Sequence, residues 1–242
     1  MKITYDEGYQ YGLGLFETIL LLKGKPISLY DHLQRLEEGL EFLNLESTIT
    51  AEKVQDYLKN KSFSEKSVLK ISVSGKNQIF ELKDYPYKAE DFQKGFRLKK
   101  SSILRNESSS LVFHKTTNYG DNILEKRRAV EDGYDEPLFF NTKGFLAEGA
   151  TTNIFLIKDD QLYTPSVESG LLPGIMRKKV INHLPVIETQ VTEKDLLQAD
   201  ELFVTNSLLG IMPVSQYEDQ EYEMNISYQL TILFEQTNSI KV

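Results

Sequence analysis

Lys115 is the residue whose neighbours best suit it to chemistry. It follows the apolar run 111–114 (LVFH) and precedes the small polar run 116–118 (TTN). This pattern predicts a strand over residues 111–114 with the lysine at its end. An amine held among apolar neighbours carries a desolvation cost when charged, which lowers its pKa and makes it a nucleophile or a base. The same pattern also fits a strand-end lysine whose ammonium lies in water.

A carboxylate and a helix start could act beside such a lysine. Glu148 precedes Gly149 and the hydroxyl residues 151–152, where a backbone can approach a ligand closely and an acid can be half buried. A solvated loop glutamate is the alternative. Pro173 and Gly174 open a predicted helix whose first amides could bind an anion, as phosphate sites do, although most helix starts bind nothing.

Two further side chains could add donors to an anion site. Arg35 follows His32 by three residues on a predicted helix and offers a fork of N–H groups, although such an arginine is usually only solvated. Ser207 offers a hydroxyl just past a predicted strand, 202–205. A reactive lysine, a carboxylate and a set of anion donors are together what a pyridoxal phosphate site needs. The lysine holds the aldehyde, the carboxylate keeps the pyridine nitrogen protonated, and the donors hold the phosphate.

The composition favours chemistry that depends on a bound cofactor. The 242 residues include no cysteine and only three histidines, with no H-E-x-x-H pair. Thiol nucleophiles, disulfides, iron–sulfur clusters and thiolate zinc sites are therefore excluded, and we expect no metal site. The segment 12–14 (GLG) lacks the third glycine of a dinucleotide fingerprint, because Glu17 occupies that position.

The charge and hydropathy of the chain exclude two classes of partner. With 28 basic and 36 acidic residues the formal charge is −8, whereas nucleic-acid binding requires clustered lysine and arginine. No run approaches the roughly 20 apolar residues of a membrane span, and the first residues lack the apolar centre of a signal peptide. We expect a cytoplasmic protein that binds neither nucleic acid nor membrane.

The elements that must position these residues fall into two groups. The first group holds a predicted hairpin of strands at 16–23 and 26–29, helices over about 30–43 and 51–60, and a strand at 67–75. Leucines spaced by three and four residues carry the first helix prediction. A polar, proline-containing stretch, 84–94, follows. The pattern predicts a small N-terminal α/β lobe over residues 1–86.

The second group begins at Gly95 and mixes short strands with helices. Predicted strands lie at 96–103, 111–114, 137–141, 145–147, 153–157, 161–163 and 202–205, and predicted helices at 121–131, 174–184, after Thr192, and at 226–236. These elements predict a larger C-terminal lobe over residues 95–242. Strand clusters mixed with helices indicate an α+β chain with two lobes.

The order of the motifs resembles the fold-type IV pyridoxal phosphate enzymes. This class IV aminotransferase family includes branched-chain and D-amino acid aminotransferases and 4-amino-4-deoxychorismate lyase. The resemblance spans almost the whole chain and is carried by 11–17 (YGLGLFE), 32–36 (HLQRL), Lys115 with Asn118, 148–153 (EGATTN), 172–177 (LPGIMR) and 199–201 (ADE). It implies a D-amino acid aminotransferase-like fold, a homodimer, and pyridoxal 5'-phosphate bound between the lobes.

The resemblance also implies roles for particular residues. Lys115 would be the Schiff-base lysine and Glu148 the partner of the pyridine nitrogen. The phosphate would be held by Arg35, the amides of Ile175 and Met176, and Ser207. Relatives often carry an arginine after the strand corresponding to 69–73, but this chain has the sequence SGK at 74–76. Lys76 and Tyr119 are therefore the candidate substrate contacts.

Within the family, three segments resemble the lyase branch. They are 174–177 (GIMR), 197–201 (LQADE) and 206–214 (NSLLGIMPV). The resemblance implies elimination of pyruvate from 4-amino-4-deoxychorismate to give 4-aminobenzoate for folate biosynthesis, with Lys115 serving as base and then as acid. A D-amino acid or branched-chain aminotransferase is the alternative reading. A binding protein that keeps the fold without the cofactor is a third.

Overall fold

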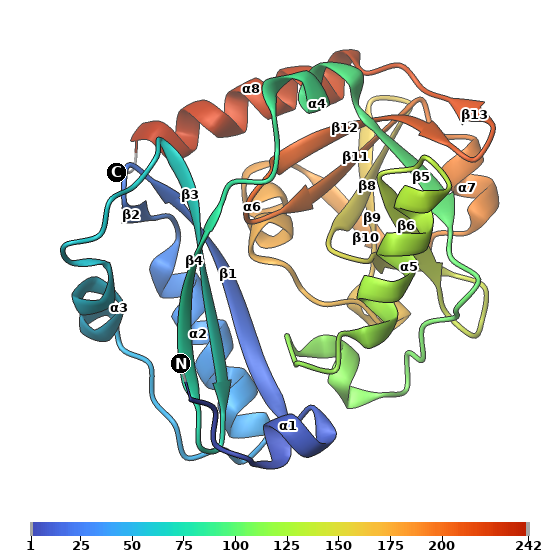
Figure 1. Ribbon diagram of the computed structural model, residues 1–242. Coiled ribbons are helices and arrows are strands. Elements are labelled where there is room, and N and C mark those ends of the chain that lie inside the picture. The colour runs from blue at the N-terminus through green and yellow to red at the C-terminus, as the bar shows by residue number, and fades with distance from the viewer. Residues whose placement is uncertain (1, 241–242) are drawn as a thin grey trace. The chain divides into compact units, whose positions relative to one another are not determined.

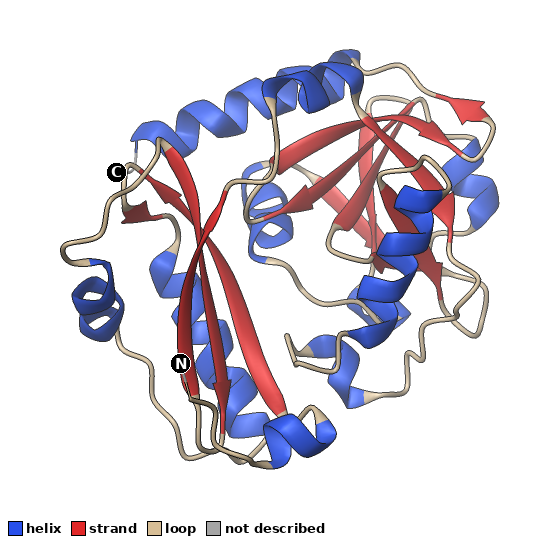
Figure 2. Ribbon diagram, in the orientation of Figure 1, coloured by secondary structure: helices blue, strands red, loops and turns tan. Residues whose placement is uncertain are grey.

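The computed structural model describes residues 2–240 as two compact units (Figures 1 and 2). The first unit contains the chain up to Pro86 together with residues 114–119. The second contains residues 87–113 and 120–240. Both units combine helices with sheets, so the α+β class predicted from the sequence is confirmed. No helix within residues 2–240 is both long and apolar enough to cross a membrane.

The first unit is an antiparallel sheet with helix α2 packed against one face. Its elements are α1 (Glu7–Tyr11), β1 (Gly14–Leu22), β2 (Lys25–Pro26), α2 (Leu29–Phe42), α3 (Ala51–Leu58), β3 (Lys66–Ser74) and β4 (Gln78–Asp84), with strand order β2-β1-β3-β4. Along β1, Leu15, Ile19 and Leu21 point to the face where Leu36 and Leu40 of α2 pack. Phe16, Thr18 and Leu20, which alternate with them, therefore face the other side of the sheet.

The second unit is built on a larger mixed sheet. Its helices are α4 (Ala89–Lys94), α5 (Gly120–Glu131), α6 (Ile175–His183), α7 (Glu193–Leu197) and α8 (Asn225–Ile240), with short 3-10 turns at Ser110–Phe113 and Val167–Ser169. Its strands are β5 (Phe96–Lys100), β6 (Glu136–Phe140), β7 (Leu146–Gly149), β8 (Asn153–Lys158), β9 (Gln161–Pro165), β10 (Val186–Thr189), β11 (Glu201–Asn206), β12 (Gly210–Tyr217) and β13 (Gln220–Glu221). The strand order is β10-β9-β8-β11-β12-β5-β6-β7, and β13 pairs with β12.

Alternation along the central strands gives this sheet two apolar faces. On β11, Leu202 and Val204 join one core cluster, whereas Phe203 joins the cluster that contains Met176 and Val180 of α6. Helix α6 therefore covers the face of β11 to which the odd-numbered residues point. The same alternation places Thr205 on the α6 side.

The structure corrects the prediction of a strand over residues 111–114. Residues 110–113 form a 3-10 turn, and β5 ends at Lys100 rather than at residue 103. The preceding segment explains the difference, because the amides of Ser108 and Ser109 donate to the side chain and carbonyl of Asn106. Such local bonds offer the backbone an alternative to pairing in a sheet. The apolar run is too short to overcome them.

Candidate active site

Lys115 lies on a short segment that runs along the start of β1. The amide N–H of Phe16 donates to the Lys115 carbonyl at 3.0 Å. The hydroxyl of Thr117 and the carboxamide of Asn118 donate to the Gly12 carbonyl at 2.7 and 2.9 Å. The backbone of the lysine is thus fixed by pairing with a strand about a hundred residues earlier, although Lys115 does not itself end a strand.

The amine of Lys115 lies against two aromatic rings. Its Nζ is 4.4 Å from the ring centroid of Phe16 and 5.4 Å from that of Tyr119, and these two rings meet edge to face at 5.1 Å. His114 stacks instead on Phe42, with ring centroids 4.0 Å apart. An amine beside two ring faces has an apolar wall against which a flat, unsaturated ligand could lie.

Arg35 forms a buried ionic cluster with Glu17 and His32. Its Nε and Nη2 donate to the two Glu17 oxygens at 2.8 and 2.7 Å, and Nδ1 of His32 donates to the same carboxylate at 2.6 Å. Burial by itself raises the pKa of Glu17, but Arg35 and His32 outweigh it and bring that pKa to about 2. Burial lowers the pKa of His32, and the Glu17 carboxylate, which acts to raise that pKa, does not offset the effect of burial. A charged guanidinium is thus held rigidly, with three of its five N–H groups not used by Glu17.

Lys70 is a second amine on the Phe16 face that the sequence analysis did not identify. It is half buried on β3, pairs with Thr18 of β1, and places Nζ 5.0 Å from the Phe16 ring centroid. Burial, with a contribution from Lys83, lowers the pKa of Lys70. The signal in the sequence that could have identified Lys70 is a lysine within the apolar strand pattern VLKIS at 68–72.

Lys76, the residue predicted to contact the substrate, lies in the exposed turn between β3 and β4. Its amide N–H donates to the Asp6 carboxylate at 2.8 Å, in a cluster that also includes Ser74 and Asn77. Those bonds help to bring the pKa of Asp6 to about 2, with the Ser74 hydroxyl as the largest cause. The backbone of Lys76 thus ties the turn to the residues before α1.

In the second unit, Glu148 is buried at the end of β7 among polar partners. Its Oε2 accepts from the Leu172 amide at 3.0 Å and lies 3.5 Å from the Asn153 amide nitrogen. Its Oε1 lies 3.2 Å from Nη2 of Arg105, whose guanidinium also stacks on Phe139 at 4.1 Å. Arg105, which the sequence analysis missed, stabilises the ionised carboxylate by its charge.

The start of α6 offers amides to a ligand. The N-cap residue of α6 is Gly174, which has no side chain to accept from the first amides, including those of Ile175 and Met176. A Cβ at Gly174 would lie 2.2 Å from the Asn153 Oδ1, so this turn has room only for glycine. Thr205, on the same side of the sheet, is fully buried and its hydroxyl has no hydrogen-bond partner within residues 2–240.

A buried hydroxyl without a partner is uncommon in proteins and points to a bound group that would satisfy it. Together with the uncapped helix start, it indicates an anion site on the α6 side of β11. Ser207 follows the end of β11 directly. Of the residues predicted for the site, Lys115, Arg35 and Tyr119 belong to the first unit, and Glu148, Ile175, Met176 and Ser207 to the second.

Comparisons with known proteins agree on one family. The sequence profile of the amino-transferase class IV family matches residues 14–217. An aminodeoxychorismate lyase of Bacillus subtilis is 31% identical over 240 residues, covering 90% of this chain and 82% of its own. A Thermotoga maritima protein described as a candidate branched-chain-amino-acid aminotransferase is 30% identical over 219 residues, covering 86% and 78%.

A solved structure supports the same relationship. The crystal structure of a candidate 4-amino-4-deoxychorismate lyase from Legionella pneumophila has a TM-score of 0.88 with this chain at 31% sequence identity. The match covers 98% of this chain and 95% of the other. The fold-type IV architecture implied by the sequence motifs is therefore confirmed.

Proposed function

Because the chain belongs to the amino-transferase class IV family, we propose that it is a pyridoxal phosphate enzyme with aminodeoxychorismate lyase activity. It would eliminate pyruvate from 4-amino-4-deoxychorismate and release 4-aminobenzoate, a step in folate biosynthesis. The observation that carries the proposal is the Lys115 amine against the Phe16 and Tyr119 rings. This wall suits a cyclic unsaturated substrate and its aromatic product.

The residues present fit pyridoxal phosphate. Thr205 supplies an unsatisfied buried hydroxyl and the α6 start supplies uncapped amides, which are the donors that a phosphate group needs. We assign Ser207 and Arg35 to the same phosphate and Glu148 to the pyridine nitrogen. When bound, the cofactor supplies an electron sink for the carbon whose proton is removed.

Glu148 would keep the pyridine nitrogen protonated. A carboxylate can do so only while it is ionised and correctly aimed. Arg105 at 3.2 Å supports the charge, and the Leu172 amide at 3.0 Å fixes the direction of the carboxylate. These contacts prepare the carboxylate before the ligand arrives, so that little reorganisation is needed on binding.

Lys115 would act as base and then as acid. Its amine would take the proton from C4 of the substrate ring and would afterwards protonate the departing enolpyruvyl group. The Phe16 and Tyr119 rings exclude water from the side of the amine that they cover. One lysine can carry both transfers, which accounts for a site without cysteine or a required histidine.

We assign a substrate carboxylate to Lys70 rather than to Lys76. Lys70 shares the Phe16 ring with Lys115, whereas Lys76 is exposed in the β3–β4 turn. A half-buried ammonium interacts with a carboxylate more strongly than one in water. The substrate carries carboxylates and no positive group other than its amine, so a cation beside the reacting lysine fits its charge.

A branched-chain or D-amino acid aminotransferase is the second candidate. The 30% identity to the Thermotoga maritima protein favours it. That reaction would use the same lysine for proton transfer but would pass the amino group to a 2-oxo acid. We separate the two by supplying the protein with pyridoxal phosphate and either 4-amino-4-deoxychorismate or an amino acid plus 2-oxoglutarate.

The lyase proposal predicts equal amounts of pyruvate and 4-aminobenzoate from the first substrate, and no amino transfer to 2-oxoglutarate. Amino transfer without 4-aminobenzoate would overturn it in favour of the aminotransferase. The Lys115→Ala variant, assayed alongside, must lose whichever activity the protein shows.

We further propose that the enzyme works as a cytoplasmic homodimer. The family resemblance carries this proposal, and the formal charge of −8 suits a protein in solution. Sedimentation equilibrium tests the assembly: a mass twice that of the chain supports a dimer, and a mass equal to that of the chain contradicts it.

A further inference from the structure

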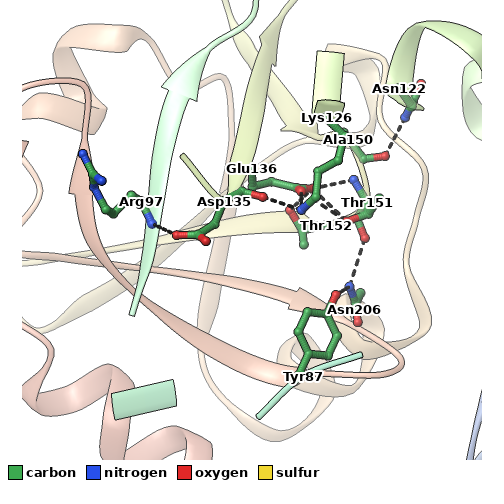
Figure 3. Close-up of polar contacts among 10 residues, drawn as sticks. All are labelled: Tyr87, Arg97, Asn122, Lys126, Asp135, Glu136, Ala150, Thr151, Thr152 and Asn206. Carbon is green, nitrogen blue, oxygen red and sulfur yellow. Dashed lines mark hydrogen bonds and ion pairs between the residues drawn. The ribbon is translucent and has the colours of Figure 1, made fainter. Parts of the chain in front are cut away.

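Polar contacts from several elements hold the loop between β7 and β8 (Figure 3). The Ala150 carbonyl accepts from the Asn122 carboxamide of α5 at 2.7 Å, and the Thr151 carbonyl accepts from Asn206 at 3.2 Å. The Thr151 amide donates to Glu136 of β6 at 2.5 Å. This loop directly follows the strand that ends with Glu148 and Gly149, so whatever fixes the loop also fixes the position of that carboxylate.

The loop packs against Glu136, a buried carboxylate. It is 0% exposed and also accepts from the hydroxyls of Thr151 and Thr152 at 3.0 and 3.1 Å. The Lys126 ammonium, 2.5 Å away, compensates its charge. A Cβ at Gly149 would lie 2.3 Å from the Thr152 hydroxyl and 2.8 Å from the Glu136 carboxylate. The loop is packed too closely on this carboxylate to shift freely.

Asn206, at the end of β11, joins this loop to a second segment. Its Oδ1 accepts from the amides of Leu208 and Leu209, each at 2.9 Å, and thereby shapes the turn that contains Ser207. Its Nδ2 donates to the Thr151 carbonyl and to the Tyr87 hydroxyl, the latter at 3.4 Å. Two amide donors on one side and a carbonyl on the other fix which end of the carboxamide is oxygen.

We propose that Asn206 is a positioning residue that sets the spacing between Glu148 and Ser207. The inference rests on the proposed function, which places Glu148 at the ring nitrogen of pyridoxal phosphate and Ser207 at its phosphate. These groups act on opposite ends of one rigid molecule, so an error in their separation weakens both contacts. Asn206 acts through the two loops and not through the reacting atoms.

The variant Asn206→Asp tests the bridge with the least change in shape. One carboxylate oxygen can still accept from the amides of Leu208 and Leu209, whereas the other faces the Thr151 carbonyl with no proton to donate. The matched control is Asn141→Asp. Asn141 accepts from two backbone amides in the same way and donates to the Ser169 carbonyl at 3.2 Å, and these side-chain hydrogen bonds go to residues outside both loops.

The readouts are the dissociation constants of pyridoxal phosphate and of pyridoxal, which lacks the phosphate, measured by titrating the cofactor-free protein. We expect N206D to weaken both ligands by about tenfold, as one lost buried hydrogen bond would. N141D should change neither by more than about twofold. The pH dependence of the bound cofactor's absorbance should shift in N206D and not in N141D, because the carboxylate at the ring nitrogen has moved.

Three outcomes would overturn the inference: unchanged binding in N206D, equal weakening in N141D, or weakening of pyridoxal phosphate alone, which would confine Asn206 to the phosphate turn. If N206D does not fold, Asn206→Ser replaces it, because a hydroxyl can still accept from the turn amides but is too short to reach Thr151. Absence of cofactor binding by the unaltered protein would remove the proposed function, whereas normal binding with an unaffected N206D would remove only this inference.

Discussion

At the scale of single residues, two lysines share one aromatic ring and differ in their surroundings. Lys115 lies between Phe16 and Tyr119, and its backbone is paired with β1. Lys70 projects from β3 and is half buried, with a lowered pKa caused mainly by burial. We assign the covalent and proton-transfer chemistry to the first lysine and the binding of a carboxylate to the second.

Lys70→Met should therefore raise the KM for 4-amino-4-deoxychorismate by about tenfold to a hundredfold, the range for loss of a charged hydrogen bond. Binding of pyridoxal phosphate should not change. In the unaltered enzyme, KM should begin to rise at a pH below 10.5, the ordinary pKa of a lysine. The reason is that the pKa of Lys70 is lowered, so its ammonium loses the proton at a lower pH. Steady-state kinetics from pH 7 upward measure both effects.

Lys76→Met is the matched control for this prediction. It removes the exposed lysine of the β3–β4 turn and should leave KM within about twofold of the original value. A larger effect for Lys76→Met than for Lys70→Met would contradict our assignment and restore the residue chosen from the sequence.

The ionic cluster of Glu17, His32 and Arg35 should make stability depend on pH. The pKa of Glu17 falls from its ordinary 4.5 to about 2 in the folded chain. The stabilisation of the fold by ionised Glu17 is therefore complete above pH 4.5 and is lost as the pH falls toward 2. Glu17→Gln should remove this dependence. At pH 7 it should also lower the free energy of unfolding by about 3–5 kcal/mol, because Arg35 keeps a buried, unpaired charge.

Urea unfolding at several pH values measures this effect. Glu81→Gln is the control, because Glu81 on β4 is 54% exposed and pairs with Lys83 in water, so it should change stability by less than about 1 kcal/mol. A Glu17→Gln protein that is as stable as the original at pH 7 would show that the buried pair does not hold α2 to β1.

At the scale of elements, loops at strand ends hold the candidate site residues of the second unit. The β7–β8 loop rests on Glu136, and the start of α6 lies beside Asn153 at the beginning of β8. Neither contact is one of the backbone hydrogen bonds that pair the strands. Site geometry therefore depends on a few buried side-chain contacts, which can be weakened without unfolding the sheet.

Glu136→Gln should loosen the β7–β8 loop selectively. The amide cannot accept from Thr151, Thr152 and Lys126 at once, so we expect hydrogen exchange of residues 150–152 to accelerate and pyridoxal phosphate binding to weaken. The control is Glu201→Gln, which alters a buried carboxylate of the same unit that accepts from Ile226 and Ser227 at the start of α8.

Both substitutions should lower the melting temperature, but only Glu136→Gln should change exchange in the loop. Faster exchange of residues 150–152 in both variants would mean that general destabilisation, and not the Glu136 contact, controls the loop.

At the scale of the whole molecule, the sequence predicted elements well where one periodicity dominates. The leucine spacing gave α2 to within a residue at each end, and the order of motifs gave the family. The turn at 110–113 and strand β4 were missed, because local bonds from Asn106 and pairing with β3 decided them. Periodicity in one segment carries no information about either.

The candidate site was only partly predictable for a similar reason. Residues that relatives share as motifs could be found by eye, but Arg105, Lys70 and Thr205 matter only through neighbours distant in the chain. The grouping of residues 114–119 with the first unit is also invisible in the order of the sequence. A lysine next to Phe16 in space lies about a hundred residues from it in the chain.

One measurement tests the central claim most directly, namely that Lys115 carries the cofactor. The protein is incubated with pyridoxal phosphate, reduced with borohydride, digested, and mapped by mass spectrometry. We predict a single pyridoxyl label, on the peptide that contains Lys115. A label on Lys70, the other amine beside the Phe16 ring, or no site-specific label at all, would contradict the account.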